Sequence, residues 1–176
     1  DAPVIDLFRA RIAAFRERLR HFGERASAAP VAFHPATVIH GDASEWSTMQ
    51  HLAGQIDGVV TSPPYATALP YIDTDRLSLL VIQQCTLAER NDYARRLTGS
   101  RDITETERRT FETAIGERAL ARHLGSETAA KTIRRVLQLN SDADVGFRRR
   151  NMAALLLRYF RSMRAVFENL AKVLVP

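Results

Sequence analysis

The predicted fold is decided by residues 57–65, which read Asp57-Gly58-Val59-Val60-Thr61-Ser62-Pro63-Pro64-Tyr65. The apolar pair Val59-Val60 is typical of the end of a short buried strand. Two consecutive prolines can neither donate to a β-ladder nor continue a helix, so the strand is predicted to stop at Thr61. The stiff loop that follows carries a hydroxyl, several carbonyls and an aromatic ring. Because ligands bind at the carboxyl ends of strands in open α/β sheets, this loop is a candidate site.

A second strand is predicted upstream of this loop. Thr37-Val38-Ile39-His40 is short and β-branched, and Gly41-Asp42 follows it as a tight turn. We expect Thr37–His40 and Asp57–Thr61 to be neighbouring parallel strands, with Asp42 and Ser62 at the same edge of the sheet. Asp42 would there either accept a hydrogen bond from the amine of an adenine ring or stabilise the turn through its own side chain.

Thr61-Ser62-Pro63-Pro64-Tyr65 resembles the catalytic motif of the amino-methyltransferases, the enzymes that methylate cytosine N4 or adenine N6 in DNA. His40-Gly41-Asp42-Ala43 is similar to the strand end that touches the adenine of their cofactor, S-adenosylmethionine. Three further segments also look like the corresponding segments of family members, namely 71–73 and 76–80 after the motif and the last five residues, 172–176. The resemblance touches residues 37–84 and 152–176.

The resemblance implies an α/β fold, in which part of a Rossmann-like methyltransferase sheet carries a mostly helical insertion. Residues 1–84 would be a partial core with the catalytic loop, and residues 85–146 a helical insertion that could recognise the target. Residues 147–176 would be a core helix leading into a truncated strand. The catalytic residues carried over are Ser62, Pro63, Pro64 and Tyr65, and the cofactor-binding residues are Asp42, Ala43 and Ser62.

The mechanism implied by the resemblance begins with a base flipped out of double-stranded DNA, as in restriction-modification enzymes. Tyr65 would stack on the base, while the Ser62 hydroxyl and the Pro63 carbonyl hold the amino hydrogens. The gain is alignment and electrostatic preorganisation, without a covalent intermediate. Cytosine C5 methylation needs a cysteine nucleophile, typically after proline, whereas the single cysteine, Cys85, follows Gln84.

The sequence departs from the family in one respect, since no Gly-rich turn is present to hold the methionine part of the cofactor. We therefore expect the chain to be a segment of a larger enzyme, inactive alone and weak in binding S-adenosylmethionine. Two alternatives remain open. One is an RNA or protein amide methyltransferase, although those relatives more often carry Asn or Asp where Ser62 stands. The other is a non-catalytic helical module that binds nucleic acid or a protein partner.

Composition indicates the number of domains, the compartment and the metal requirement that we expect for this protein. The chain has 176 residues, 45% of them hydrophobic, which suits one domain with a packed core. There is no apolar run of membrane-spanning length, and one cysteine fits a reducing cytoplasm, where we expect the protein to act on DNA. The five histidines show no metal-ligand spacing, so no metal is expected. The oligomeric state is not predicted.

Arginine supplies nearly all of the positive charge, and the net charge of +5 comes from the residues after the motif. Arginine suits bidentate contacts with phosphate, so the insertion is a candidate DNA-binding surface. A composition rich in arginine and alanine could equally reflect coding bias, with the arginines on solvated helix faces. The candidate phosphate-binding residues are Arg95, Arg96, Arg108, Arg109, Arg134 and Arg135.

Apolar periodicity predicts the helices. Residues 4–22 carry apolar side chains at steps of three and four and are predicted to form a helix that ends at Gly23. We interpret its apolar stripe as a layer packed on the sheet, with partner binding as the alternative. A short helix is expected within 44–55 with Ser44 as its cap, another from about residue 74, two to four within 88–140, and a long one over 147–174.

Overall fold

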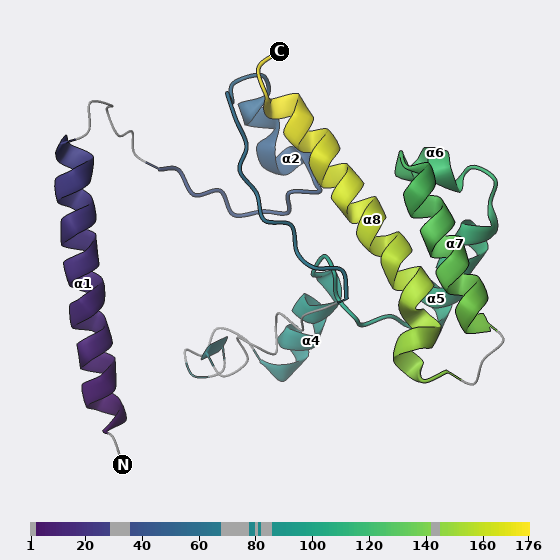
Figure 1. Cartoon of the computed structure of the whole chain (residues 1–176), viewed down its shortest axis with the longest axis horizontal. Helices are drawn as coiled ribbons and strands as arrows, with labels where there is room; N and C mark the ends of the chain where they lie inside the picture. Colours follow the sequence, from purple (N-terminus) through teal and green to yellow (C-terminus); the bar gives the residue numbers. More distant parts are fainter. Residues whose placement is uncertain (1–2, 29–35, 68–77, 80, 82–85, 142–144) are drawn as a thin grey trace. The chain divides into compact units, whose positions relative to one another are not determined.

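The computed structural model describes residues 3–28, 36–67, 78–79, 81, 86–141 and 145–176. The chain divides into two compact units, Asp1–Ile39 and His40–Pro176, which we describe separately. The first unit holds the helix α1 (Val4–Ala28). The second holds the short helix α2 (Trp46–Met49), the 3-10 helix η1 (Gln50–Leu52) and five longer segments, which are α4 (Leu87–Arg96), α5 (Glu105–Gly116), α6 (Leu120–Leu124), α7 (Glu127–Ser141) and α8 (Phe147–Val173) (Figure 1).

The described residues are all-helical and contain no β-sheet, so the predicted α/β class is wrong. An isolated parallel bridge between Ile56 and Leu174 is the one β-type pairing among them. Both predicted strands, Thr37–His40 and Asp57–Thr61, are irregular chain. β-branched residues form a strand only where a neighbouring strand and a covering layer receive them. The described residues provide no neighbouring strand for either segment, and Val60 is fully exposed.

The helix α1 confirms the predicted amphipathic helix but runs past Gly23 to Ala28. A single glycine costs a helix only about 1 kcal/mol. Arg20 forms ion pairs with Glu17, one turn before it, and with Glu24, one turn after it, so the second pair spans Gly23 and supports the helix there. None of the residues of α1 is buried. The expected role of its stripe as a layer on a sheet is wrong for the same reason that the fold class is wrong, since the described residues form no sheet.

The hydrophobic core of the second unit lies where α5, α6 and α7 pack against the N-terminal half of α8 (Figure 1). Its fully buried members come from all four helices: Ile115, Leu120, Ile133 and Leu157. At the edge of this core the Arg161 guanidinium lies 5.8 Å from the centre of the Phe111 ring. The prediction of two to four helices within residues 88–140 is therefore confirmed by α4 to α7, and the prediction of a long helix over 147–174 by α8.

Local sequence signals explain where these helices begin. Thr86 and Thr104 each form a capping box. The threonine hydroxyl accepts a hydrogen bond from the backbone amide of the glutamate three residues later, and the carboxylate of that glutamate accepts one from the backbone amide of the threonine. The glutamates are Glu89 and Glu107, and the pKa of each is lowered mainly by the backbone hydrogen bond from its threonine. Such a box satisfies two otherwise unpaired amides at a helix start.

The region before the motif is only partly helical. Instead of one helix within 44–55, the chain forms α2 and then η1, and Glu45 rather than Ser44 is the cap residue. Met49 of α2 is buried. Of the predicted helix from about residue 74, the structure describes residues 78, 79 and 81, which are helical, while its other residues and Cys85 lie outside the described residues. Among the described helices none could cross a membrane, and the described part of the chain holds no cluster of side chains able to bind a metal ion.

Candidate functional site

The loop at residues 61–65 exposes the groups that the resemblance assigns to chemistry. The side chains of Ser62 and Pro63 are exposed, Pro64 is half-buried, and the ring of Tyr65 is 63% exposed. Hydrogen bonds between described residues leave the Ser62 hydroxyl and the Pro63 carbonyl without an internal partner. The Pro64 carbonyl, by contrast, accepts a 3.0 Å hydrogen bond from the Tyr159 hydroxyl of α8. The loop thus presents two acceptors and an aromatic ring, while the Pro64 carbonyl is hydrogen-bonded to α8.

The end of this loop is held by a second segment, residues 99–101. Gly99 packs so closely that a Cβ there would lie 2.8 Å from the Tyr65 carbonyl oxygen, and its φ of +85° also favours glycine. The Thr67 amide donates to the Gly99 carbonyl at 3.2 Å, and Arg101 Nε donates to the Thr67 carbonyl at 2.7 Å. These contacts limit the motion of the loop backbone at its carboxyl end.

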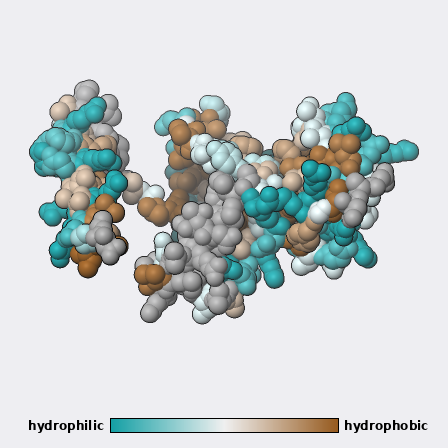
Figure 2. Space-filling view, turned by 60° about the horizontal axis from the view of Figure 1, so that its bottom comes forward, coloured by the Kyte–Doolittle hydropathy of each residue, from teal (hydrophilic) through white to brown (hydrophobic). Residues whose placement is uncertain are grey.

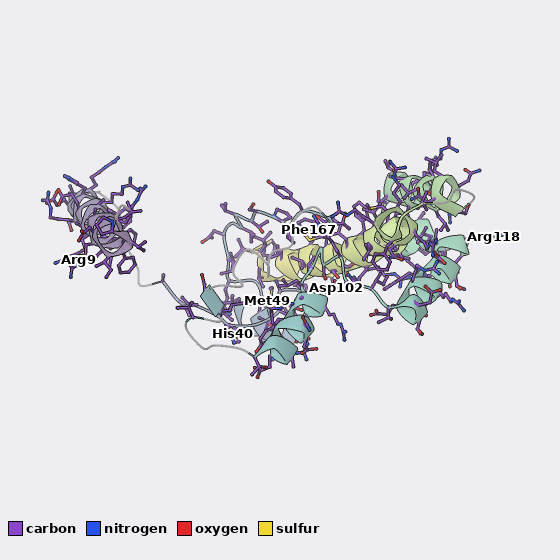
Figure 3. All side chains as sticks on the ribbon, turned by 90° about the horizontal axis from the view of Figure 1, so that it is seen from below. Arg9, His40, Met49, Asp102, Arg118 and Phe167 are labelled. Carbon is purple, nitrogen blue, oxygen red and sulfur yellow. The ribbon has the colours of Figure 1, made fainter. Side chains whose placement is uncertain are left out.

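Arg158 in turn ties this second segment to α8. Its guanidinium donates to the carbonyls of Ser100 and Asp102, both at 2.8 Å. Asp102 lies beside the ribbon of α8 (Figure 3). Burial lowers the pKa of the Arg158 guanidinium, and the carboxylates of Glu107 and Asp102 oppose this effect. Because a half-buried cation has lost part of its hydration and needs hydrogen-bond partners, Arg158 fixes residues 100–102 on the helix.

Asp42 has a structural role in this chain. Its Oδ1 accepts hydrogen bonds from the Ser44 amide at 2.8 Å and from the Ser44 hydroxyl at 2.7 Å. This is the turn-stabilising role that the sequence left open beside cofactor contact. The buried Asn169 of α8 holds the same turn, since its Nδ2 donates to the carbonyls of Ala43 and Ser44 at 3.2 and 2.9 Å.

The two candidate segments are therefore held by the same helix but not at the same place. Tyr159 holds the Ser62 loop and Asn169 holds the Asp42 turn. At 1.5 Å per residue these two points on α8 are about 15 Å apart along its axis. The expectation that Asp42 and Ser62 meet at one sheet edge is wrong, because the residues that the structure describes form no sheet to align the two segments.

The six candidate phosphate-binding arginines differ in what they contact. Arg108 is largely buried between Glu105 and Glu112, and Arg134 donates to the carbonyls of Ile115 and Glu117 at the end of α5. Both have structural roles within the helical bundle. The others are exposed: Arg95 lines a depression beside Glu107, and the remaining three each contact one polar side chain, Arg96 with Asp92, Arg109 with Glu105 and Arg135 with Gln138.

Sequence reasoning missed the residues that position the loop, namely Tyr159, Arg158 and Gly99, and the residue that holds the Asp42 turn, Asn169. Each acts across a separation of 34 to 126 residues, where no local pattern relates the partners. One signal was available, because Asn169 interrupts a long helix with many buried apolar positions, and a buried polar side chain needs a hydrogen-bond partner. The apolar periodicity of residues 147–174 places Tyr159 on a helix but gives no partner for its hydroxyl.

The helical bundle adds a basic depression that was also not predicted. It is lined mainly by Arg122, His123, Arg161 and Arg164. Arg164 pairs with Glu168 and donates to the Arg122 carbonyl.

Comparison of the whole chain with protein-family models, with curated proteins and with solved structures gives no match in any of the three.

Proposed function

We propose that this chain holds the target amine for an S-adenosylmethionine-dependent amino-methyltransferase acting on cytosine N4 or adenine N6 of DNA. The observation that carries the proposal is the division of acceptors in the loop. The Pro64 carbonyl is bonded to Tyr159, whereas the neighbouring Ser62 hydroxyl and Pro63 carbonyl have no internal partner among the described residues. Both acceptors lie beside the Tyr65 ring, which is 63% exposed, so all three groups are accessible to a ligand from the same loop.

The chemistry assigned to the loop is the orientation of an exocyclic amine. The Ser62 hydroxyl oxygen and the Pro63 carbonyl oxygen each accept one amino hydrogen, which directs the nitrogen lone pair away from both. Tyr65 stacks on the ring of the base and excludes water from one side. The hydrogen bond from Tyr159 and the close contact with Gly99 keep the acceptors in place, so little reorganisation is needed when the base arrives.

The described residues do not fit the whole cofactor. Asp42 is exposed, its Oδ1 is bonded to Ser44, and its turn is held about three helical turns from the loop along α8. The chain also lacks a Gly-rich turn that could hold the methionine part. The proposal therefore gives this chain the base-holding part of the reaction and derives no step from the cofactor.

Homopolymer binding tests the proposal directly. Cytosine and adenine carry an exocyclic amine and thymine does not, so oligo(dC) and oligo(dA) are compared with oligo(dT) at about twelve nucleotides, a length that one binding groove can cover. Ser62→Ala should weaken binding to oligo(dC) or oligo(dA) by roughly two- to tenfold, as expected for one lost hydrogen bond, and leave oligo(dT) unchanged. Ser47→Ala, at an exposed serine of α2, is the matched control.

The aromatic ring is tested in the same assay. Tyr65→Ala should weaken binding to all three oligonucleotides by about 1–3 kcal/mol, because stacking does not depend on the base. The double variant should lose less than the sum, since both side chains act on one base. An equal effect of Ser62→Ala on oligo(dT) would show that the loop does not recognise an amine. Tight binding of S-adenosylmethionine in equilibrium dialysis would contradict the proposal that this chain supplies only the base-holding part of the reaction.

A second function, a non-catalytic helical module that binds nucleic acid, is favoured by the all-helical structure and by the exposed cations Arg109 and Arg135. Charge reversal at these two positions tests it better than reversal at Arg108 or Arg134, which would also break contacts inside the bundle. If the double reversal removes binding and its salt dependence while Ser62→Ala and Tyr65→Ala change nothing, the binding module replaces the methyltransferase proposal.

A further inference from the structure

The helix α1 carries an apolar seam with the spacing of a coiled coil. Its apolar residues follow one another at steps of three, four, three, four and three, which is the a and d pattern of three heptads. Their exposed fractions lie between 44% and 64%. Figure 2 shows apolar and hydrophilic atoms side by side on the surface of this helix. The seam residues are Ile5, Phe8, Ile12, Phe15, Leu19 and Phe22.

The positions that flank this seam are all arginine, apart from residues 4 and 23. In a heptad the e and g positions lie on either side of the seam and face the partner helix. On α1 these positions hold Arg9, Arg11, Arg16, Arg18 and Arg25. Four of the five make no ion pair within the described residues, and Arg9 has a single long contact of 3.7 Å with Asp6. Arg9 and its neighbouring side chains project from the helix in Figure 3.

The acidic residues of α1 lie on the opposite side of the helix. Asp6, Glu17 and Glu24 occupy the b and f positions, and Arg20 at another b position bonds to both glutamates. The pKa of Glu17 is lowered by its hydrogen bond from Arg20. Charge is thus balanced on the outer face of the helix, while the flanks of the seam carry unneutralised positive charge.

A second copy of this chain does not fit this seam. In a parallel pair, g of one helix faces e of the other, which would place Arg11 against Arg16 of the second copy. In an antiparallel pair, e faces e and g faces g, and both are again arginine pairs. Like charges at such positions are destabilising. The flanks instead complement a helix whose own e and g positions are acidic.

We propose that α1 is a docking helix that forms a heterotypic coiled coil with an acidic amphipathic helix of a partner protein. The a and d residues supply the apolar contact, and the arginines at e and g select glutamate or aspartate on the partner and exclude self-pairing. The proposal is independent of the amine-holding loop, since α1 belongs to the separate unit Asp1–Ile39.

The test uses the full chain and two synthetic peptides of about four heptads, each with Ile at a and Leu at d. One peptide has Glu at every e and g position, and the other has Lys there. Fluorescence anisotropy should show the Glu peptide binding at least about tenfold more tightly than the Lys peptide at about 50 mM salt, with a smaller ratio at high salt. Equal affinity for both peptides, or no binding of either, would overturn the proposal.

Charge reversal makes the result independent of folding. Arg16→Glu with Arg18→Glu keeps residues of good helix propensity and should invert the preference toward the Lys peptide. An unfolded helix could lose binding but could not invert it. Phe15→Ala with Leu19→Ala should weaken the Glu peptide without lowering helicity, which circular dichroism checks.

Two further outcomes would assign the seam to another occupant and overturn the proposal. One is a concentration-dependent dimer of the chain in sedimentation that Phe15→Ala with Leu19→Ala abolishes. The other is binding to vesicles containing about one quarter anionic lipid while the two peptides bind equally, since a basic amphipathic helix can also lie on a membrane surface.

Discussion

Tyr159→Phe tests whether α8 holds the candidate loop in place. The substitution removes one hydroxyl, whose hydrogen bond to the Pro64 carbonyl is 3.0 Å long, and keeps the ring that packs edge-to-face on Phe160 at 5.4 Å. A neutral hydrogen bond of this kind contributes about 0.5–1.5 kcal/mol net. Pro64 is only half-buried, so water can reach its carbonyl once the hydroxyl is gone, and we expect the lower part of that range.

The expected effect is local rather than global. Opening of the loop should become about two- to fivefold more frequent, while the unfolding of the core around Ile133 stays unchanged, because local and global opening have separate free energies. The readout is hydrogen exchange at the Thr67 amide, which donates to the Gly99 carbonyl at the carboxyl end of the loop. If the loop is the amine-holding site, affinity for oligo(dC) or oligo(dA) should fall by a similar factor.

Tyr93→Phe is the matched control, since the Tyr93 ring is 45% exposed and its hydroxyl makes no hydrogen bond within the described residues. It should change neither the exchange rate nor the affinity. Unchanged protection of the Thr67 amide in Tyr159→Phe would refute the reasoning, because it would show that the hydroxyl bond does not restrain the loop.

Two other predictions concern stability. Gly99→Ala should destabilise the second unit by about 1–3 kcal/mol, because the new Cβ would lie 2.8 Å from the Tyr65 carbonyl oxygen and residue 99 has a positive φ. A Cβ at Gly116 would meet nothing within 4 Å, so the control Gly116→Ala should be neutral or slightly stabilising. Urea unfolding of both variants measures the difference in the free energy of unfolding. Hydrogen bonds from Arg108 and then Arg109 lower the pKa of Glu105 from 4.5 to about 2. Because the folded pKa is the lower one, the stability that this carboxylate contributes should be present above about pH 4.5 and lost as the pH falls toward 2. An NMR titration should place its midpoint near 2 and move it upward in Arg108→Gln; a wild-type midpoint near 4.5 would contradict the pairing.

The helical part of this protein was largely predictable, because helix formation depends on signals within a few residues. The apolar stripes of residues 4–22 and 147–174 gave both long helices, and the bundle of α5, α6 and α7 lies within the region predicted to be helical. Capping boxes such as that of Thr104 and Glu107 are equally local. The exposed loop with Ser62 and Tyr65 was predicted from its two prolines, and it is irregular chain as expected.

Only the tertiary structure decided what the local signals could not. A β-branched segment such as Thr37–His40 has the pattern of a strand, but pairing depends on a neighbour elsewhere in the chain, and the described residues provide none. The contacts that position the loop and the Asp42 turn, from Tyr159 and Asn169, span 95 and 126 residues. Such contacts depend on how helices pack, because the energy of a buried polar side chain is set by its surroundings and not by its sequence neighbours.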